Sequence, residues 1–205
     1  ASSANPQYES AFTPSPIIEE ACPTSSYVTY KFRPSKINDS EVKMTWMDGG
    51  IRPSKPELIS DKDSLGDSGC LMIGENGLIW CEDYGVNAKL YINGQDGAVE
   101  KGKISGINSV EFGHQSHWID AIKEGYGSEK HKMLTSNFDF AGPLSEIVLL
   151  GNVALRSNYL KRSKRSNVFI GKKQLLYDNK NMIITNLDEA NQFLTRDYRS
   201  GWELS

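Results

Sequence analysis

Ser-Tyr-Val-Thr-Tyr-Lys-Phe-Arg, residues 26–33, carries the clearest structural signal in this chain of 205 residues. Large apolar side chains occupy every second position in it, at Val28, Tyr30 and Phe32. A period of two is that of a β-strand, whose successive side chains point to opposite faces. Residues 41–47 repeat the alternation. The two segments therefore predict antiparallel strands with one covered face and one polar face.

Three shorter strands are predicted at residues 70–73, 78–82 and 88–92. Asn76 and Gly77 separate the first two. Asn-Gly is the strongest short hairpin signal, because both residues tolerate a positive φ. The pattern therefore predicts a small antiparallel sheet in the middle of the chain.

Helical patterns dominate after residue 106. Residues 114–124 show an apolar face and end before Gly125. A clearer helix is predicted with Pro143 in its first turn, where a missing N–H costs nothing. Gly151 lies inside its apolar stripe and indicates close approach to another backbone. The full stripe is Leu144, Ile147, Val148, Gly151, Ala154 and Leu155.

A final helix is predicted to begin at Asn186, because Glu189 completes the spacing of a capping box. Strands first and helices mostly later predict an α+β fold: an open, mostly antiparallel sheet with helices packed on one face. The length fits one domain or one large piece of a bigger protein, so residues 1–205 are assigned to a single domain.

Composition excludes several classes of protein. Apolar residues make up 38% of the chain and predict an ordinary globular core. The net charge of −3 is too small to indicate nucleic acid or a membrane surface as a partner. No apolar run approaches the roughly 20 residues of a membrane helix, so no membrane association is predicted.

The cysteines and histidines predict no metal site. Cys22, Cys70 and Cys81 form an odd, sparse set rather than a disulfide framework, and they are interpreted as buried free thiols. No C-x-x-C occurs. His114 and His117 have the spacing to share a helical face, but no third ligand is evident. His117 remains a candidate acid or base.

The segment from Trp46 to Arg52 is the most unusual in the chain. A strand ends there in Asp48, followed by two flexible glycines, an isoleucine, Arg52 and a proline. Asp48 and Arg52 can hydrogen-bond to sugar hydroxyls, and Trp46 offers a stacking face. These three residues and His117 are the candidate substrate-binding residues. In the alternative interpretation, Asp48 only caps an ordered loop and Trp46 lies in the core.

Six segments share an order along the chain that resembles a known family. They are residues 44–53 (Met-Thr-Trp-Met-Asp-Gly-Gly-Ile-Arg-Pro), 66–77, 117–125 (beginning His-Trp-Ile-Asp-Ala-Ile), 136–146 (beginning Ser-Asn-Phe and continuing Ala-Gly-Pro-Leu-Ser-Glu), 149–156 (Leu-Leu-Gly-Asn-Val-Ala-Leu-Arg) and the tail 172–204. Together they resemble the C-terminal part of bacterial oxidoreductases of the glucose–fructose oxidoreductase, inositol dehydrogenase and MocA family (Gfo/Idh/MocA). The resemblance spans residues 44–204.

The resemblance implies a two-part enzyme that oxidises or epimerises sugars, inositols or related polyols. In such enzymes an N-terminal Rossmann domain holds NAD or NADP, and the second domain contributes an open sheet and a homo-oligomer interface. The family's catalytic lysine lies in a Glu-Lys-Pro motif of the first domain. Lys55 precedes a proline here, but it follows Ser54 and lies in the wrong part, so that role is not assigned to it. A D-x-x-x-H motif would fall before Ala1.

The chain by itself is predicted to bind no cofactor and to catalyse nothing. A dinucleotide site needs G-x-G-x-x-G directly after a strand, and the sequence has none. No catalytic residue and no metal ligand is therefore assigned within it. The resemblance implies the protein's own Rossmann domain and a sugar or polyol substrate as partners. It leaves the bacterial cytoplasm and the periplasm both open.

The sequence departs from the family at two places. Tyr177-Asp178 stands where many relatives have Trp-Asp, and residues 158–172 form a longer segment than usual. Two other interpretations remain: a non-catalytic carbohydrate-binding module that uses Trp46, Asp48 and Arg52, and a structural assembly domain.

Overall fold

The computed structural model describes residues 23–95, 97–98 and 113–203. It also gives the backbone of three short strands, β1 (Ser2–Ala4), β2 (Tyr8–Ser10) and β3 (Thr13–Pro14). The α+β prediction is confirmed, because helices accompany several small antiparallel sheets that all stay open in the described part of the chain.

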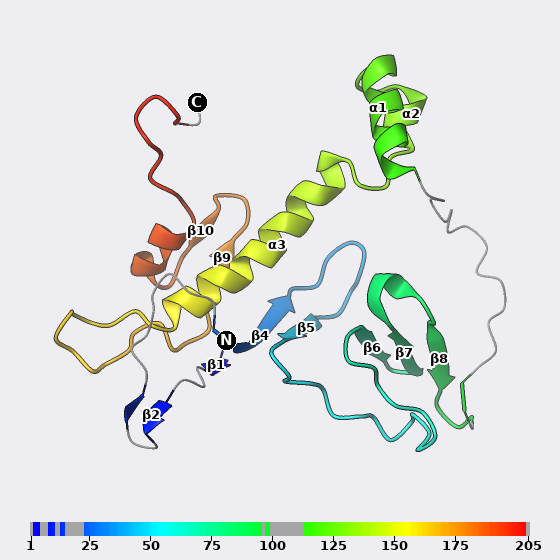
Figure 1. Ribbon diagram of the computed structural model, residues 1–205, viewed down its shortest axis with the longest axis horizontal. Coiled ribbons are helices and arrows are strands. Elements are labelled where there is room, and N and C mark those ends of the chain that lie inside the picture. Colours follow the sequence, from blue (N-terminus) through cyan, green and yellow to red (C-terminus); the bar gives the residue numbers. More distant parts are fainter. Residues whose placement is uncertain are drawn as a thin grey trace. The chain divides into compact units, whose positions relative to one another are not determined.

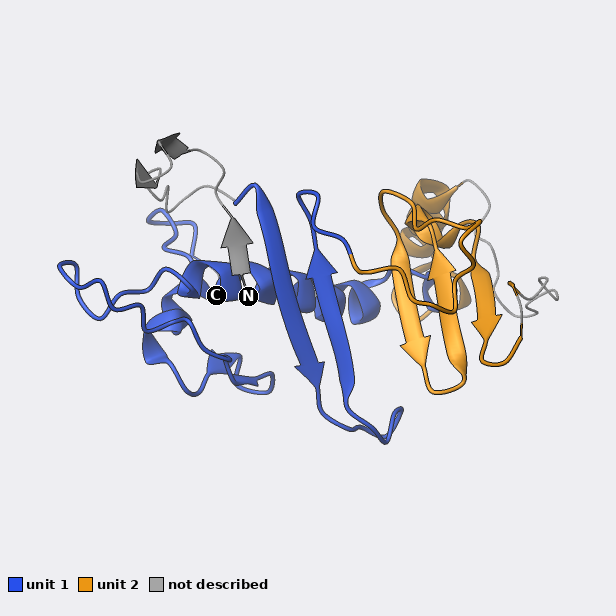
Figure 2. Cartoon of the chain, turned by 90° about the horizontal axis from the view of Figure 1, so that it is seen from below, with its two compact units in different colours: residues 1–52, 131–205 blue, residues 53–130 orange. Residues whose placement is uncertain are grey.

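The chain divides into two compact units, residues 1–52 with 131–205 and residues 53–130 (Figure 2). The assignment of residues 1–205 to a single domain stays a prediction.

The main sheet of the first unit is built from β4 (Ser25–Phe32) and β5 (Val42–Met47), with β1 on the other side of β4. Val28 lies opposite Trp46, and Tyr30 lies opposite Met44. Directly opposed residues of an antiparallel pair project to the same face, so the two predicted apolar sets share one face of the sheet. β5 is an edge strand of this sheet.

The long helix α3 (Phe138–Ser157) packs against β4, as Figure 1 shows. Gly151 makes this contact possible, because a Cβ at that position would lie 2.6 Å from the hydroxyl oxygen of Tyr30. The sequence indicates a neighbouring backbone at Gly151, whereas the structure places a tyrosine hydroxyl there. Burial raises the pKa of Tyr30.

Helix α3 begins earlier than the sequence indicates. Asn137 caps it: the side-chain oxygen accepts from the N–H of Phe140 at 3.2 Å, and the carbonyl accepts from the N–H of Ala141 at 2.8 Å. Pro143 therefore lies inside the helix, and its predicted place in the first turn is wrong. It has no N–H to donate to the preceding turn.

The opposite flank of α3 supports the hydrophobic core of the first unit. Val153 packs there with Ile184, Leu187 and Ala190, which are all buried. Ile184 belongs to β10 (Ile183–Ile184), which pairs with β9 (Tyr177–Asp178), and Ala190 belongs to the 3₁₀ helix η2 (Asp188–Phe193), which begins directly after Leu187.

A hydrogen bond joins this C-terminal segment to α3. The hydroxyl of Tyr177 donates to Oε1 of Glu146 at 2.6 Å. Burial and this bond to a carboxylate raise the pKa of Tyr177 to about 12. Tyr177 therefore remains a protonated donor throughout the physiological pH range.

The predicted helix start at Asn186 is wrong. The helix there is η2, which begins two residues later, and Asn186 instead joins two segments of backbone. Its side-chain oxygen accepts from the N–H of Leu176 and its amide donates to the carbonyl of Gln174, both at 2.8 Å. Asn186 therefore joins the segment before β9 to the segment after β10 instead of capping a helix.

The second unit contains the predicted hairpin. β6 (Cys70–Gly74) and β7 (Gly77–Cys81) pair around the turn, and β8 (Lys89–Ile92) pairs with β7 after the short 3₁₀ helix η1 (Asp83–Gly85). One face of this sheet covers a small core of Ile59, Leu78 and Tyr91. The helices of this part of the chain are α1 (His114–Glu124), as predicted, and α2 (Glu129–Lys132), which ends beyond the unit's boundary.

Helix α3 is long and apolar enough to cross a membrane, judged by length and composition alone. Only 11% of its most apolar stretch is buried. The core helices of soluble proteins share this length and composition, so these two properties alone do not assign α3 to a membrane. The absence of a membrane partner stays a prediction.

The contact between Gly151 and Tyr30 can be tested by overpacking. Gly151→Leu should lower the free energy of unfolding by about 1–3 kcal/mol, because the added side chain has to displace the tyrosine ring. Asn152→Leu places the same side chain on the exposed neighbouring position and is the matched control. Urea denaturation measures both variants. Equal stability of Gly151→Leu and the wild type would show that α3 does not pack on β4 at this glycine.

Candidate functional site

The carboxylate of Asp48 forms the centre of the candidate site in the first unit. It follows the last residue of β5, and both of its oxygens accept hydrogen bonds. The N–H and the hydroxyl of Ser26 donate to Oδ1 and Oδ2, each at 2.6 Å. The indole Nε1 of Trp46 donates to Oδ2 at 2.9 Å. Asp48 thus ties the end of β5 to the start of β4 and orients the indole.

These donors stabilise the charged form of the carboxylate. The hydroxyl of Ser26, and then the indole of Trp46 and the backbone N–H of Ser26, hold the pKa of Asp48 below its usual value of 3.8, although partial burial opposes them. A carboxylate offers about four acceptor positions, and three are in use here. The arrangement suits Asp48 to position Trp46 rather than to bind several ligand hydroxyls itself.

Trp46 is the most accessible aromatic surface at this site. Its side chain is 60% exposed, so the alternative that places Trp46 in the core does not hold. It projects to the sheet face on which α3 packs, because it is paired with Val28 in the strand register. An exposed indole with a fixed N–H is suited to stack on the apolar face of a sugar ring.

The two glycines after Asp48 have different roles. Gly49 has a φ of +61°, and a Cβ there would collide with the backbone of Thr24 and Ser25. The hydroxyl of Ser25 donates to the carbonyl of Gly49 at 2.7 Å. Gly50 has a φ of +89° and open space around it. Gly49 is therefore required by the fold, whereas Gly50 leaves room beside the loop.

The structure brings together only part of the predicted set. Trp46 and Asp48 are in direct contact, and Arg52 is exposed at the end of the same loop. His117 is exposed on α1, which belongs to the second unit. No group of three or more His, Cys, Asp or Glu side chains that could hold a metal occurs among the described residues.

Ser26 is the residue of this site that the sequence does not reveal. It is 2% exposed and lies 22 positions before Asp48. A serine at the start of a strand has no pattern that identifies its partner. Only the antiparallel register of β4 and β5 would place Ser26 beside Asp48, because the next pair after Tyr27 and Met47 is Ser26 and Asp48.

A second polar cluster, also unpredicted, lies in the second unit. Nζ of Lys89 lies 2.6 Å from Oδ1 of Asp63, and the hydroxyl of Tyr91 donates to Oδ2 at 3.3 Å. The hydrogen bond from Lys89 is the main reason that the pKa of Asp63 is lowered. Nζ of Lys55 donates to the carbonyl of Ser60 at 3.3 Å and to Asp61 at 3.2 Å. These bonds order the loop that precedes β6 and give Lys55 a structural role.

No known family model matches this chain, and no curated protein matches it either. The likeness to Gfo/Idh/MocA enzymes therefore depends on the motifs alone.

The role of Asp48 can be tested with Asp48→Asn. An amide cannot accept from the indole and from both Ser26 donors at once, so the variant should lose about 1.5–3 kcal/mol of stability at neutral pH. Because the folded pKa is depressed, the stabilisation is present above pH 3.8 and is lost as the pH falls through the folded pKa. The difference between wild type and variant should therefore shrink on acidification.

Asp39→Asn is the matched control, because Asp39 is exposed in the loop between β4 and β5. Urea denaturation at several pH values measures all three proteins. A gap between the wild type and Asp48→Asn that does not change with pH would contradict the assigned hydrogen bonds.

Proposed function

We propose that this chain is the substrate-side and oligomerisation domain of an NAD(P)-dependent oxidoreductase that acts on sugars or polyols. In this proposal the enzyme is of the Gfo/Idh/MocA type. The cofactor and the catalytic lysine belong to an N-terminal Rossmann domain outside these residues, and the chain alone is inactive.

The observation that carries the proposal is the apolar surface that α3 leaves open. Leu144, Val148 and Leu149 are 48%, 61% and 59% exposed. Apolar side chains concentrated on one element are a common sign of a surface that another protein covers. A second domain of the same protein is the partner that the motifs favour.

Residues of the resembling segments also support the fold in a consistent way. Asn137 caps α3, Gly151 admits the hydroxyl of Tyr30, and Asn186 joins two backbone segments. Tyr177, which replaces the more usual tryptophan, hydrogen-bonds to Glu146. Residues of these segments thus hold α3 and the C-terminal part of the chain in place.

In the proposed enzyme, Trp46 contacts the substrate, and Asp48 positions the indole of Trp46. The exposed indole supplies the stacking face, its N–H is held by Asp48, and Arg52 at the end of the loop can donate to sugar oxygens. His117 completes the set only if the whole protein brings α1 to this loop. The alternative, a carbohydrate-binding or structural module without catalysis, uses the same indole but needs no cofactor domain.

Titration of NADH into this chain tests the proposal. We expect no saturable binding at micromolar cofactor by fluorescence or calorimetry, because the chain has no glycine-rich turn between a strand and a helix. The protein extended through the reading frame before Ala1 should bind NADH or NADPH and reduce the cofactor with a sugar or polyol. Saturable NADH binding by the present chain contradicts the proposal, and an extended protein without cofactor binding favours the module.

The sheet also supports a proposal of self-association. Tyr27 and Met47 are directly paired on the face opposite α3, and both are only partly buried. A sheet face with such residues is commonly covered by a second copy. Light scattering across a range of concentrations should show a dimer or larger assembly that Met47→Lys weakens. A wild-type protein that stays monomeric at every concentration would contradict assembly through this face.

A further inference from the structure

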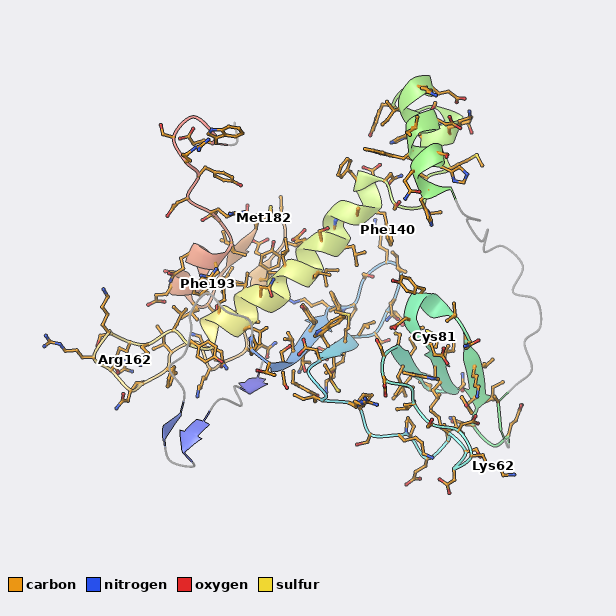
Figure 3. All side chains as sticks on the ribbon, in the orientation of Figure 1. Lys62, Cys81, Phe140, Arg162, Met182 and Phe193 are labelled. Carbon is orange, nitrogen blue, oxygen red and sulfur yellow. The ribbon has the colours of Figure 1, made fainter. Side chains whose placement is uncertain are left out.

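Cys70 and Cys81 face each other across the open end of the β6–β7 hairpin. Cys70 is the first residue of β6 and Cys81 is the last residue of β7, and the two are direct partners in the strand register. Both thiols are free, and Sγ of Cys81 lies 3.7 Å from the carbonyl oxygen of Cys70. Figure 3 marks Cys81 on this hairpin. Opposed side chains of an antiparallel pair project to the same face, so the two sulfur atoms share one side of the sheet.

The spacing of opposed strand residues is close to that of a disulfide. Their Cα atoms lie about 4.5–5.5 Å apart, inside the range of about 4.4–6.8 Å that disulfides span. Opposed Cβ atoms lie about 4.5–5.5 Å apart, whereas the Cβ atoms of a disulfide lie about 3.5–4.5 Å apart. The two Cβ atoms therefore need to move closer together by at most about 1 Å. Cys70 and Cys81 form the last pair of the β6–β7 ladder, so no further pair of these two strands resists such a movement.

Gly69 keeps the chain close to β7 at this point. It has a φ of +149°, and a Cβ there would collide with the carbonyl oxygen of Cys81 and lie 2.7 Å from the ring of Trp80. A side chain at position 69 would therefore push Cys70 away from its partner. The absence of a side chain at Gly69 therefore permits the close approach of the two strand ends that carry the cysteines.

The two thiols differ in access. Cys70 is exposed, whereas Cys81 is 7% exposed. A reagent in solution can therefore reach Cys70 first, and Cys81 is placed to attack the product from within the protein. The sequence predicts buried thiols at both positions, and the structure corrects this for Cys70. Partial desolvation, together with the neighbouring Cys81, raises the pKa of Cys70, so this cysteine rests as a thiol and reacts through its small thiolate fraction.

We propose that Cys70 and Cys81 are a redox-sensitive dithiol site, with small-molecule disulfides such as glutathione disulfide as the oxidant. The thiolate of Cys70 attacks one sulfur of glutathione disulfide and releases one glutathione, which takes up a proton. The thiolate of Cys81 then attacks Sγ of the mixed disulfide and releases the second glutathione. The protein loses two electrons and two protons, and one glutathione disulfide becomes two glutathiones.

The cross-link would close the hairpin at the end opposite its turn. It would fix β7 to β6 on the side where Met72, Ile79 and Leu90 are exposed, and so change the mobility of that face. The proposal does not depend on the oxidoreductase function, because neither thiol belongs to the loop of Trp46 and Asp48.

Peptide mapping of the wild-type chain tests the proposal directly. Trypsin cleaves after Lys62 and Lys89 and leaves Cys70 and Cys81 together in one peptide, residues 63–89. Cys22 lies in a different peptide. The native chain is equilibrated with glutathione and glutathione disulfide, and free thiols are then alkylated in denaturant. The expected product is a peptide that carries no alkyl group and is lighter by two hydrogens than the unmodified dithiol. Dithiothreitol should restore two alkylated cysteines.

Two controls show that the folded hairpin is responsible. In Cys70→Ser the buried Cys81 should remain alkylated and free of glutathione. In urea the wild-type cysteines should form the disulfide about tenfold less favourably, a change of about 30 mV in reduction potential. Two free thiols after oxidation, a stable glutathione adduct on Cys70, or equal formation in urea and buffer would each overturn the proposal.

Discussion

The close contact between α3 and β4 at Gly151 is the constraint on which the first unit depends. The helix has one flank against the hydroxyl of Tyr30 and another in the core formed by Val153, Ile184 and Ala190. Because one rigid helix serves both flanks, the sheet and the C-terminal segment are positioned by the same element. Its remaining flank is exposed and carries Val148 and Leu149.

The candidate site is consistent with a domain that presents a substrate rather than reacts with it. Its carboxylate is occupied by Ser26 and Trp46 and is held in the charged form. A group stabilised in this way is a poor proton acceptor near neutral pH, so Asp48 is unsuited to general base catalysis. What remains available is the indole face of Trp46 and the open space at Gly50. The arrangement suits binding and orientation, with the chemistry supplied elsewhere.

Local patterns in the sequence predicted much of the secondary structure. The period of two located β4 and β5 with their shared apolar face, Asn76-Gly77 located the hairpin, and residues 114–124 formed the helix as expected. These features depend on neighbours within a few positions. The position of Gly151 in an apolar stripe also indicated a close approach correctly, although the partner is a side chain.

Other features depend on contacts that no local pattern contains. Asn186 has the spacing of a helix cap, yet its amide is taken by two backbone groups from the strand region before it. Asp48 receives its main bonds from Ser26, on the neighbouring strand. Asn137 extends α3 back through a segment whose proline suggested a later start. In each case a polar side chain had several possible partners, and the tertiary fold selected one.

The central claim is that the exposed flank of α3 receives a cofactor-binding domain of the same protein. The most direct measurement is the affinity between this chain and the polypeptide encoded before Ala1, produced separately and followed by calorimetry. The account predicts a specific complex that Val148→Asp weakens by about tenfold or more, equivalent to about 1.4 kcal/mol. Ile37→Asp, at an exposed apolar position in the loop between β4 and β5, is the matched control and should leave the affinity unchanged. Absence of a complex, or equal affinity of the wild type and Val148→Asp, would contradict the account.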